Sequence, residues 1–197
     1  MNPYTAMINQ GKRMLGVIAG ANYTFTIGRP PYTQGDNTPV VVGTGSFHIE
    51  PAGPNWAVDK IPDVEFYEVC GDTDSFQEGD LIWGGAQTPR VTVFSKIEGQ
   101  EFLAIKTDKP CRIEDITLGW ENLYFDYMNS TSAGPEDEYR EPTSLNNPVR
   151  RVVMIDLPEV TEAMKFFDDQ IGWNWAIAKV DRKFNIMTLF LDQPNRT

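Results

Sequence analysis

Hydrophobic and polar residues alternate in short runs along most of the chain, and this pattern is typical of β-strands. Residues 22–27 and 63–69 show it, although Tyr67 breaks the alternation in the second run, and glycine, proline or acidic residues separate the runs. Short apolar runs predict further strands at 40–50, 81–85, 90–97, 102–107, 149–157, 173–181 and 184–192. The sequence therefore predicts a mainly β protein, built as a small β-barrel or a sandwich.

Two segments show helical spacing instead. Residues 2–20 begin with an Asn-Pro pair, which suits an N-cap and a first helical position, and apolar residues recur on one face. Residues 158–171 begin with a proline and carry glutamates in the first turns. Val160, Met164 and Phe167 would share one face of this second helix. The C-terminal part is then predicted to be a β-α-β-β unit.

A polar segment without periodicity, residues 129–148, separates two parts of the chain. Loops of this length inside a compact domain are usually functional or disordered. The predicted organisation is an N-terminal helix with a β-barrel-like body over 1–128, a polar loop or arm over 129–148, and the β-α-β-β unit over 149–197. We expect these parts to pack as one compact protein.

The chain carries a formal net charge of -11. Such a surface repels phosphate backbones and anionic membranes, because binding to either depends on Lys and Arg. Solubility, a basic protein partner or cation binding remain as interpretations of the acidity. No apolar run approaches the length of a membrane helix, and polar residues interrupt the N-terminal segment where a secretion signal would be apolar. We therefore expect a soluble protein made in a cytoplasm.

The stretch FQEGDLIWGG, residues 76–85, suggests a phosphate loop, a cation site or a turn. A phosphate loop usually leads into a helix and often carries a Lys, but this stretch has no Lys and strand patterns flank it. A turn explains it better, because Gly79 and Asp80 lead into a strand and the Gly-Gly pair permits a positive φ. Acidic side chains around the turn supply oxygen ligands for a cation, although a solvated acidic turn is the simpler interpretation. The candidate cation ligands are Asp72, Asp74, Glu78 and Asp80.

No catalytic or metal-binding arrangement emerges from the residue types. His48 is the sole histidine, and Cys70 and Cys111 are too few for a zinc cluster; whether the two cysteines pair stays open. A carboxylate pair for hydrolysis can be chosen from 28 acidic residues in many ways, so their number carries no weight. Trp173 and Trp175 would point to the same face of a strand, either into the core or outward as a sugar platform. We expect no enzymatic activity and no cofactor.

Three features, taken in order, resemble a kind of structural protein of tailed bacteriophages. They are the N-terminal helical segment 2–20, the aromatic-bearing strand ANYTFTIGRP over 21–30, and FQEGDLIWGG as a Phe-x-x-Gly-Asp turn leading into a strand. The strand RVTVFSKI and the stretch FLAIKTDKPCRIED follow. The chain is similar in these features to small β-barrel proteins known as phage head–tail connectors, stoppers or minor tail proteins. The resemblance covers residues 3–115, and the C-terminal part lies outside it.

The resemblance implies a non-enzymatic structural component of a virion, in a neck or tail ring held by inter-subunit contacts. Its partners would be other virion structural proteins and further copies of itself, with DNA passing nearby without specific binding and no membrane involved. An acidic channel would let DNA slide rather than adhere. The protein would be assembled in the host cytoplasm and located in the virion. The candidate interface residues are Lys12, Arg13, Glu136, Asp137, Glu138 and Tyr139.

Two alternatives to this role remain. The first is a carbohydrate-binding module that uses exposed tryptophans. The second is a hydrolase that uses paired carboxylates, at least one of which would have a raised pKa in a deep cleft.

Overall fold

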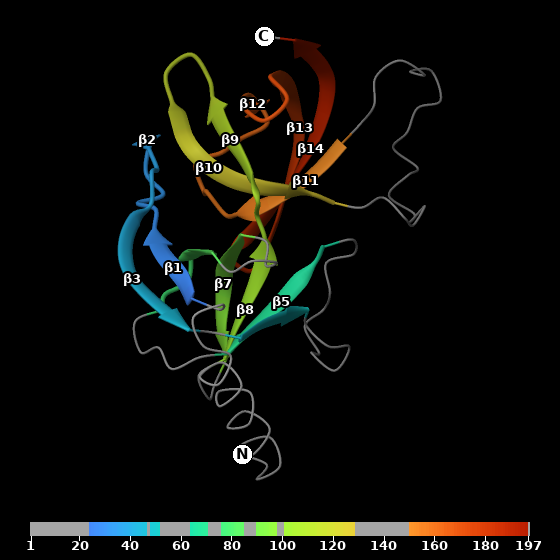
Figure 1. The fold of residues 1–197 in the computed structure, drawn as a ribbon. Coiled ribbons are helices and arrows are strands. Elements are labelled where there is room, and N and C mark those ends of the chain that lie inside the picture. Colours follow the sequence, from blue (N-terminus) through green and yellow to red (C-terminus); the bar gives the residue numbers. More distant parts are fainter. Residues whose placement is uncertain are drawn as a thin grey trace. The chain divides into compact units, whose positions relative to one another are not determined.

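The structure is a computed structural model, and β-strands are the regular elements of its described part (Figure 1). The chain forms two compact units. Unit 1 comprises residues 1–31, 39–58 and 65–108, and unit 2 comprises residues 32–38, 59–64 and 109–197. The residues that the structure describes are 24–46, 48–51, 64–70, 76–84, 90–97, 101–128 and 150–196.

Unit 1 is one antiparallel sheet with the strand order β3-β1-β6-β7-β8-β5-β4. Its strands are β1 (Thr24–Arg29), β3 (Val40–Ser46), β4 (His48–Pro51), β5 (Phe66–Cys70), β6 (Leu81–Trp83), β7 (Val91–Ile97) and β8 (Glu101–Lys106). Strands β3 and β4 lie at opposite ends of this order, yet a single residue, Phe47, separates them in the chain. The sheet must therefore curl until its first and last strands come together. Its core is built from Phe25, Ile27, Val69, Phe76, Ile82, Val91, Val93, Phe102 and Ala104.

Unit 2 is a closed six-stranded barrel with one short added strand. The strands are β2 (Gly35–Asp36), β9 (Lys109–Glu114), β10 (Gly119–Tyr127), β11 (Arg150–Ile155), β12 (Lys165–Asp168), β13 (Trp173–Lys183) and β14 (Ile186–Arg196). The pairing of β10 with β11 closes the ring β9-β10-β11-β14-β13-β12, and β2 pairs in parallel with the start of β10. Large side chains fill the interior, among them Trp120, Trp175, Phe125 and Phe166. The barrel is a packed core and not a pore.

The direction of the strands fixes which connections share an end of the barrel. Neighbouring strands of the ring are antiparallel throughout. The connections β9–β10, β11–β12 and β13–β14 therefore lie at one end, which we call the β9–β10 end. The short strand β2 joins the barrel near this end, because Gly35 pairs with Trp120 at the start of β10.

Each of the predicted strands overlaps a strand of the structure. The predictions at 22–27, 63–69 and 90–97 correspond to β1, β5 and β7, and the remaining ones also fall on strands. The segment 40–50 is divided into β3 and β4. Residues 109–128 were expected in the N-terminal body, but they pair as β9 and β10 with strands of the C-terminal part.

The predicted helix over 158–171 is wrong. Residues 165–168 form β12, which pairs with β9 on one side and β13 on the other. Ahead of β12, two single turns follow each other, with hydrogen bonds from the Val160 N–H to the Leu157 carbonyl and from the Met164 N–H to the Thr161 carbonyl. These turns bury Val160 and Met164 at helix-like spacing, and strand pairing then overrides helix propensity. Over residues 150–196, which the structure describes, the C-terminal part consists of strands and turns and is not a β-α-β-β unit.

The predicted N-terminal helix and the polar segment 129–148 lie outside the described residues. No segment of the described chain forms a helix of the length and apolarity needed to cross a bilayer.

Candidate functional site

The Phe-x-x-Gly-Asp stretch of unit 1 turns a corner, and a buried ion pair fixes it. The carboxylate of Asp80, which is fully buried, accepts hydrogen bonds from Arg29 Nε at 2.7 Å and Nη2 at 2.8 Å. It also accepts one from the Gln77 N–H at 2.8 Å. Gly79 has a φ of +91°, which glycine adopts without steric cost, and its N–H donates to the Val93 carbonyl. The hydrogen bond to Asp80 raises the pKa of the Arg29 guanidinium, so the guanidinium stays charged.

The ion pair at this turn leaves few carboxylate oxygens for the candidate cation site. Both oxygens of the Asp80 carboxylate are engaged by Arg29, and Glu78 is exposed. Asp72 and Asp74 lie outside the described residues. Within the described ranges, no group of three or more His, Cys, Asp or Glu side chains is placed to hold a metal ion.

The candidate interface residues Lys12, Arg13, Glu136, Asp137, Glu138 and Tyr139 also lie outside the described part of the chain. His48 lies on β4, as predicted for a strand residue. Cys111 is a buried free thiol on β9, and burial raises its pKa.

The tryptophans that the structure describes do not form an exposed platform. Trp120 and Trp175 are 1% and 0% exposed, and Trp83 and Trp173 are half-buried. The rings of Trp173 and Trp175 are 5.8 Å apart between centroids, in accord with the prediction that they share a face. That face is directed to the barrel core. Trp56 lies outside the described residues.

A polar cluster lies at the opposite end of the barrel from the β9–β10 end. The Tyr127 hydroxyl donates to the carboxylate of Asp168, which is 1% exposed and also accepts from the N–H groups of Gln170 and Ile171. The guanidinium of Arg150 lies 5.0 Å from the centre of the Tyr127 ring. Burial first, and then the Asp168 carboxylate, raise the pKa of Tyr127 well above its usual value. The phenol is therefore a hydrogen-bond donor that ties β10 to β12, and it is not a base.

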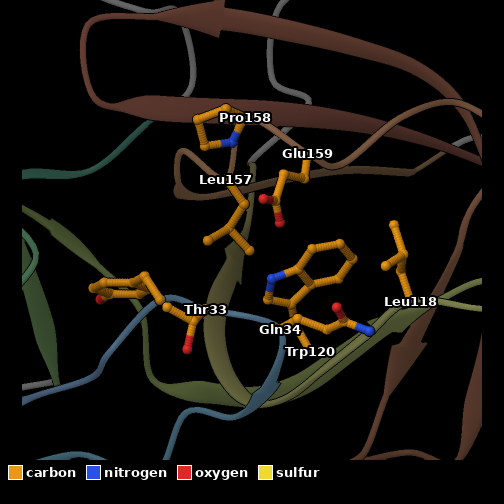
Figure 2. A pocket seen from close by; sticks show the side chains of 8 residues that line it. Thr33, Gln34, Leu118, Trp120, Leu157, Pro158 and Glu159 are labelled. Atoms are coloured by element: carbon orange, nitrogen blue, oxygen red, sulfur yellow. The ribbon is translucent and has the colours of Figure 1, made fainter.

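A cavity of about 380 Å³ opens at the β9–β10 end of the barrel (Figure 2). Three segments of unit 2 line it: Tyr32–Gln34, the start of β10 with Leu118 and Trp120, and Leu157–Glu159. Figure 2 shows the indole of Trp120 in the middle of this set, with the side chains of Leu157 and Glu159 directed toward it. The cavity lies within the size range of small-molecule sites, and barrel mouths are a common place for such sites.

Hydrogen bonds hold each of the three lining segments in place. Arg182 donates to the carbonyls of Leu157 at 3.2 Å and Val160 at 2.6 Å, and so fixes the β11–β12 connection. Asn37, fully buried, accepts from the Thr33 N–H at 3.0 Å and donates to the Thr33 carbonyl at 3.1 Å. The Asp115 carboxylate accepts from the Leu118 N–H at 2.7 Å. The lining is therefore built before any ligand arrives.

A hydrogen-bond donor and a hydrogen-bond acceptor both face this cavity. Trp120 is 1% exposed, and no described residue accepts a hydrogen bond from its indole N–H. The indole N–H of Trp175 also lacks an acceptor within the described part, but that residue lies in the packed interior and does not line the cavity. Glu159 is exposed and brings a carboxylate to the rim. The cavity thus offers a donor and an acceptor above an apolar floor.

The backbone at one side of the cavity is held in an unusual conformation. Tyr32 has a φ of +51°, which is rare for a bulky residue and marks a backbone held by its surroundings. Its neighbour Gln34 donates from its side-chain amide to the Thr117 carbonyl at 3.2 Å, and its amide oxygen remains an acceptor. The segment Tyr32–Gln34 therefore forms a wall of the cavity whose conformation is fixed by contacts within unit 2.

Sequence reasoning missed this cavity. Its segments are distant in the chain, and Leu157–Glu159 was assigned to a strand end and a helix start. No single stretch carries a signal for it. Only the pairing of β2 with β10, together with the turns ahead of β12, brings the segments together.

Exposed apolar side chains stand out at several turns and at one strand end. Val40, Val41 and Val42 of β3 are 67%, 59% and 43% exposed, next to a register shift in the pairing with β1. Ile116 is fully exposed in the β9–β10 connection, and Phe184 is exposed with a φ of +57° in the β13–β14 turn. Such side chains contribute nothing to the core of their own unit, so they are candidates for contacts with other molecules.

The fold and sites define a mainly β protein with a closed six-stranded barrel and, in its described part, no assembled metal-binding cluster. No family model, no curated protein and no solved structure matches the chain.

Proposed function

We propose that this protein is a non-enzymatic structural component of a tailed-phage virion, part of a neck or tail ring held together by inter-subunit contacts. The observation that carries the proposal is the Arg29–Asp80 ion pair. It joins two of the stretches that carry the resemblance to phage connector and tail proteins, ANYTFTIGRP and FQEGDLIWGG. The residues that mark the resemblance thus serve the architecture of unit 1, as expected for a structural part.

The exposed valines of β3 support contacts between subunits. A strand end that presents apolar side chains on both faces favours association, because natural strand edges normally carry charges or proline there. The register shift between Ile27 and Gly28 of β1 lies opposite these valines and locally changes the alternation of the strand. Val40, Val41 and Val42 are therefore added to the proposed interface, together with Lys12, Arg13 and the segment 136–139.

The charge of the chain agrees with the remaining parts of the proposal. With a net charge of -11, the protein would repel DNA that passes nearby and would bind none specifically. Its partners would be other virion structural proteins and copies of itself in a ring. The protein would assemble in the host cytoplasm and remain in the virion.

Quantitative peptide mass spectrometry of purified phage particles tests the proposal. We expect a small, fixed number of copies per particle, measured against the major capsid protein. Absence of the chain from purified particles would refute the structural role.

A pair of variants tests the interface in the same particles. Val41→Lys should lower the incorporation of the protein, whereas Thr44→Lys, on the same strand and also exposed, should not. Equal incorporation of Val41→Lys and the unaltered chain would remove β3 from the interface.

A further inference from the structure

We propose that the cavity at the β9–β10 end of unit 2 binds a neutral carbohydrate through its hydroxyl groups. This inference rests on the cavity alone and is independent of the virion role. The tryptophan that takes part is the buried Trp120, which acts through its N–H and not through an exposed ring face.

The unused hydrogen-bonding groups of the cavity select the ligand class. Among the described residues, the Trp120 indole N–H has no acceptor, and the Glu159 carboxylate stands at the rim of the same cavity. An indole N–H can only donate, and a carboxylate can only accept. A hydroxyl group does both, so one sugar ring can accept from Trp120 and donate to Glu159. The Thr33 hydroxyl and the amide oxygen of Gln34 add further groups that can exchange hydrogen bonds with hydroxyls.

Other ligand classes fit these groups less well. An anion would meet the Glu159 carboxylate, which is the one charged side chain among the lining residues. A purely apolar ligand would bury the indole N–H without a partner, at a cost of about 1–3 kcal/mol. A cationic group would satisfy Glu159 but would offer Trp120 no acceptor. A neutral polyhydroxyl ligand avoids all three penalties.

The apolar part of the lining suits the C–H faces of a sugar. Leu118 and Leu157 lie on either side of the indole (Figure 2), and Pro158 and Tyr32 also line the cavity. Apolar walls with a few placed polar groups are the usual composition of a small-molecule site.

An extended peptide is the less favoured occupant, because the backbone of the rim is already paired. The N–H of Thr33 donates to Asn37, that of Leu118 to Asp115, and that of Val160 to the Leu157 carbonyl. A peptide that adds to a sheet depends on open main-chain groups. In this cavity, the groups that remain available for hydrogen bonds to a ligand are on side chains and not on the backbone.

The test is saturation-transfer NMR on the full chain with a panel of neutral sugars: glucose, galactose, mannose and N-acetylglucosamine, with glucuronate as the anionic control. We expect at least one neutral sugar to bind at concentrations up to about 20 mM, in the millimolar range that corresponds to roughly -4 kcal/mol. Glucuronate should bind at least about tenfold more weakly because of Glu159, a difference of about 1.4 kcal/mol.

Variants decide whether the signal comes from this cavity. Glu159→Ala should lower the affinity about tenfold, whereas Glu162→Ala should leave it unchanged, because Glu162 is exposed in the same connection but does not line the cavity. Gln34→Ala should also weaken binding without disturbing the core, since Gln34 is exposed.

Two results would overturn the inference. One is the absence of binding by every neutral sugar of the panel at about 20 mM. The other is binding that Glu159→Ala and Gln34→Ala leave unchanged, which would place the sugar elsewhere.

Discussion

Replacing Arg29 by methionine should destabilise unit 1 by about 3 kcal/mol, because the change leaves the buried carboxylate of Asp80 without its charged partner. Asp80 is fully buried and accepts two hydrogen bonds from the guanidinium, at 2.7 and 2.8 Å. Methionine keeps much of the aliphatic length of the arginine and removes its charge. Within the described residues, the donor that then remains for the Asp80 side chain is the Gln77 N–H, a single donor for two oxygens.

The magnitude follows from the burial of the two partners. Removing one partner of a buried pair costs about 3–5 kcal/mol, whereas an exposed pair contributes about 0–1 kcal/mol. The side chain of Asp80 is 0% exposed and that of Arg29 is 34% exposed, so water can replace part of the lost interaction. We therefore take the lower end of the buried range. A loss of this size corresponds to a change of about a hundredfold in the opening equilibrium.

Hydrogen exchange read by mass spectrometry measures this loss for each unit separately. Amides of β7 and β8 should exchange about a hundredfold faster in Arg29→Met, and amides of β13 and β14 in unit 2 should keep their rates. The matched control is Arg112→Met in unit 2, which breaks the half-exposed pair with Asp169 at 2.7 Å. We expect that control to cost under about 1 kcal/mol. If Arg29→Met costs no more than Arg112→Met, the argument that Asp80 is a structural anchor is refuted.

Three further predictions address packing and ionisation. Gly28→Ala should cost about 1–3 kcal/mol in urea unfolding, because a Cβ there would overlap the Trp83 ring and lie 2.7 Å from Pro39 Cβ. Gly43→Ala, with its nearest neighbour at 3.8 Å, should cost clearly less, and equal losses would contradict the steric argument. Tyr127→Phe should lose about 1–3 kcal/mol by removing the donor to buried Asp168, and an unchanged urea midpoint would contradict that role. Burial raises the pKa of Cys111, so its thiol should stay protonated and should not react with iodoacetamide at neutral pH until the chain unfolds. Because the thiol ionises more easily in the unfolded state, the free energy of unfolding should fall as the pH rises through the unfolded-state pKa of this thiol. Labelling of the folded protein at the rate of a free thiol would contradict this.

Strands were predictable from the sequence because their signal is local. The short apolar runs at 63–69 and 90–97 predicted strands, and β5 and β7 lie there. Burial itself does not alternate in β7, where Val91, Thr92, Val93 and Phe94 are all buried. The failure at 158–171 has an equally local origin. Two consecutive single turns space Val160 and Met164 as a helix would, and pairing with β9 and β13 then decides that residues 165–168 are extended.

Closure of the barrel could not be predicted, because it depends on pairings between distant segments. Strand β9 pairs with β12 and β10 pairs with β11, across a polar segment that gives no indication of register. The division of the chain into units follows from the same pairings. Residues 32–38 belong to unit 2 through the contact of β2 with β10, although the strands on either side of them belong to unit 1.

Binding depends on which polar groups are hydrogen-bonded within the protein and which remain open to a ligand. The sequence alone does not show to which of these two sets a polar residue belongs. Asp80 was a candidate cation ligand from the sequence, and nothing in the sequence distinguished Asp168 from the other acidic residues. Each is buried and hydrogen-bonded in the service of a turn. The side chain of Trp120 is buried as deeply, but no described residue accepts from its N–H, and it lines a cavity. Its N–H is not among the buried atoms that lack a partner, so it is open to the cavity, where a hydroxyl of a ligand can accept from it. The cavity at the β9–β10 end is therefore a stronger guide to binding than the abundance of acidic residues or of tryptophan.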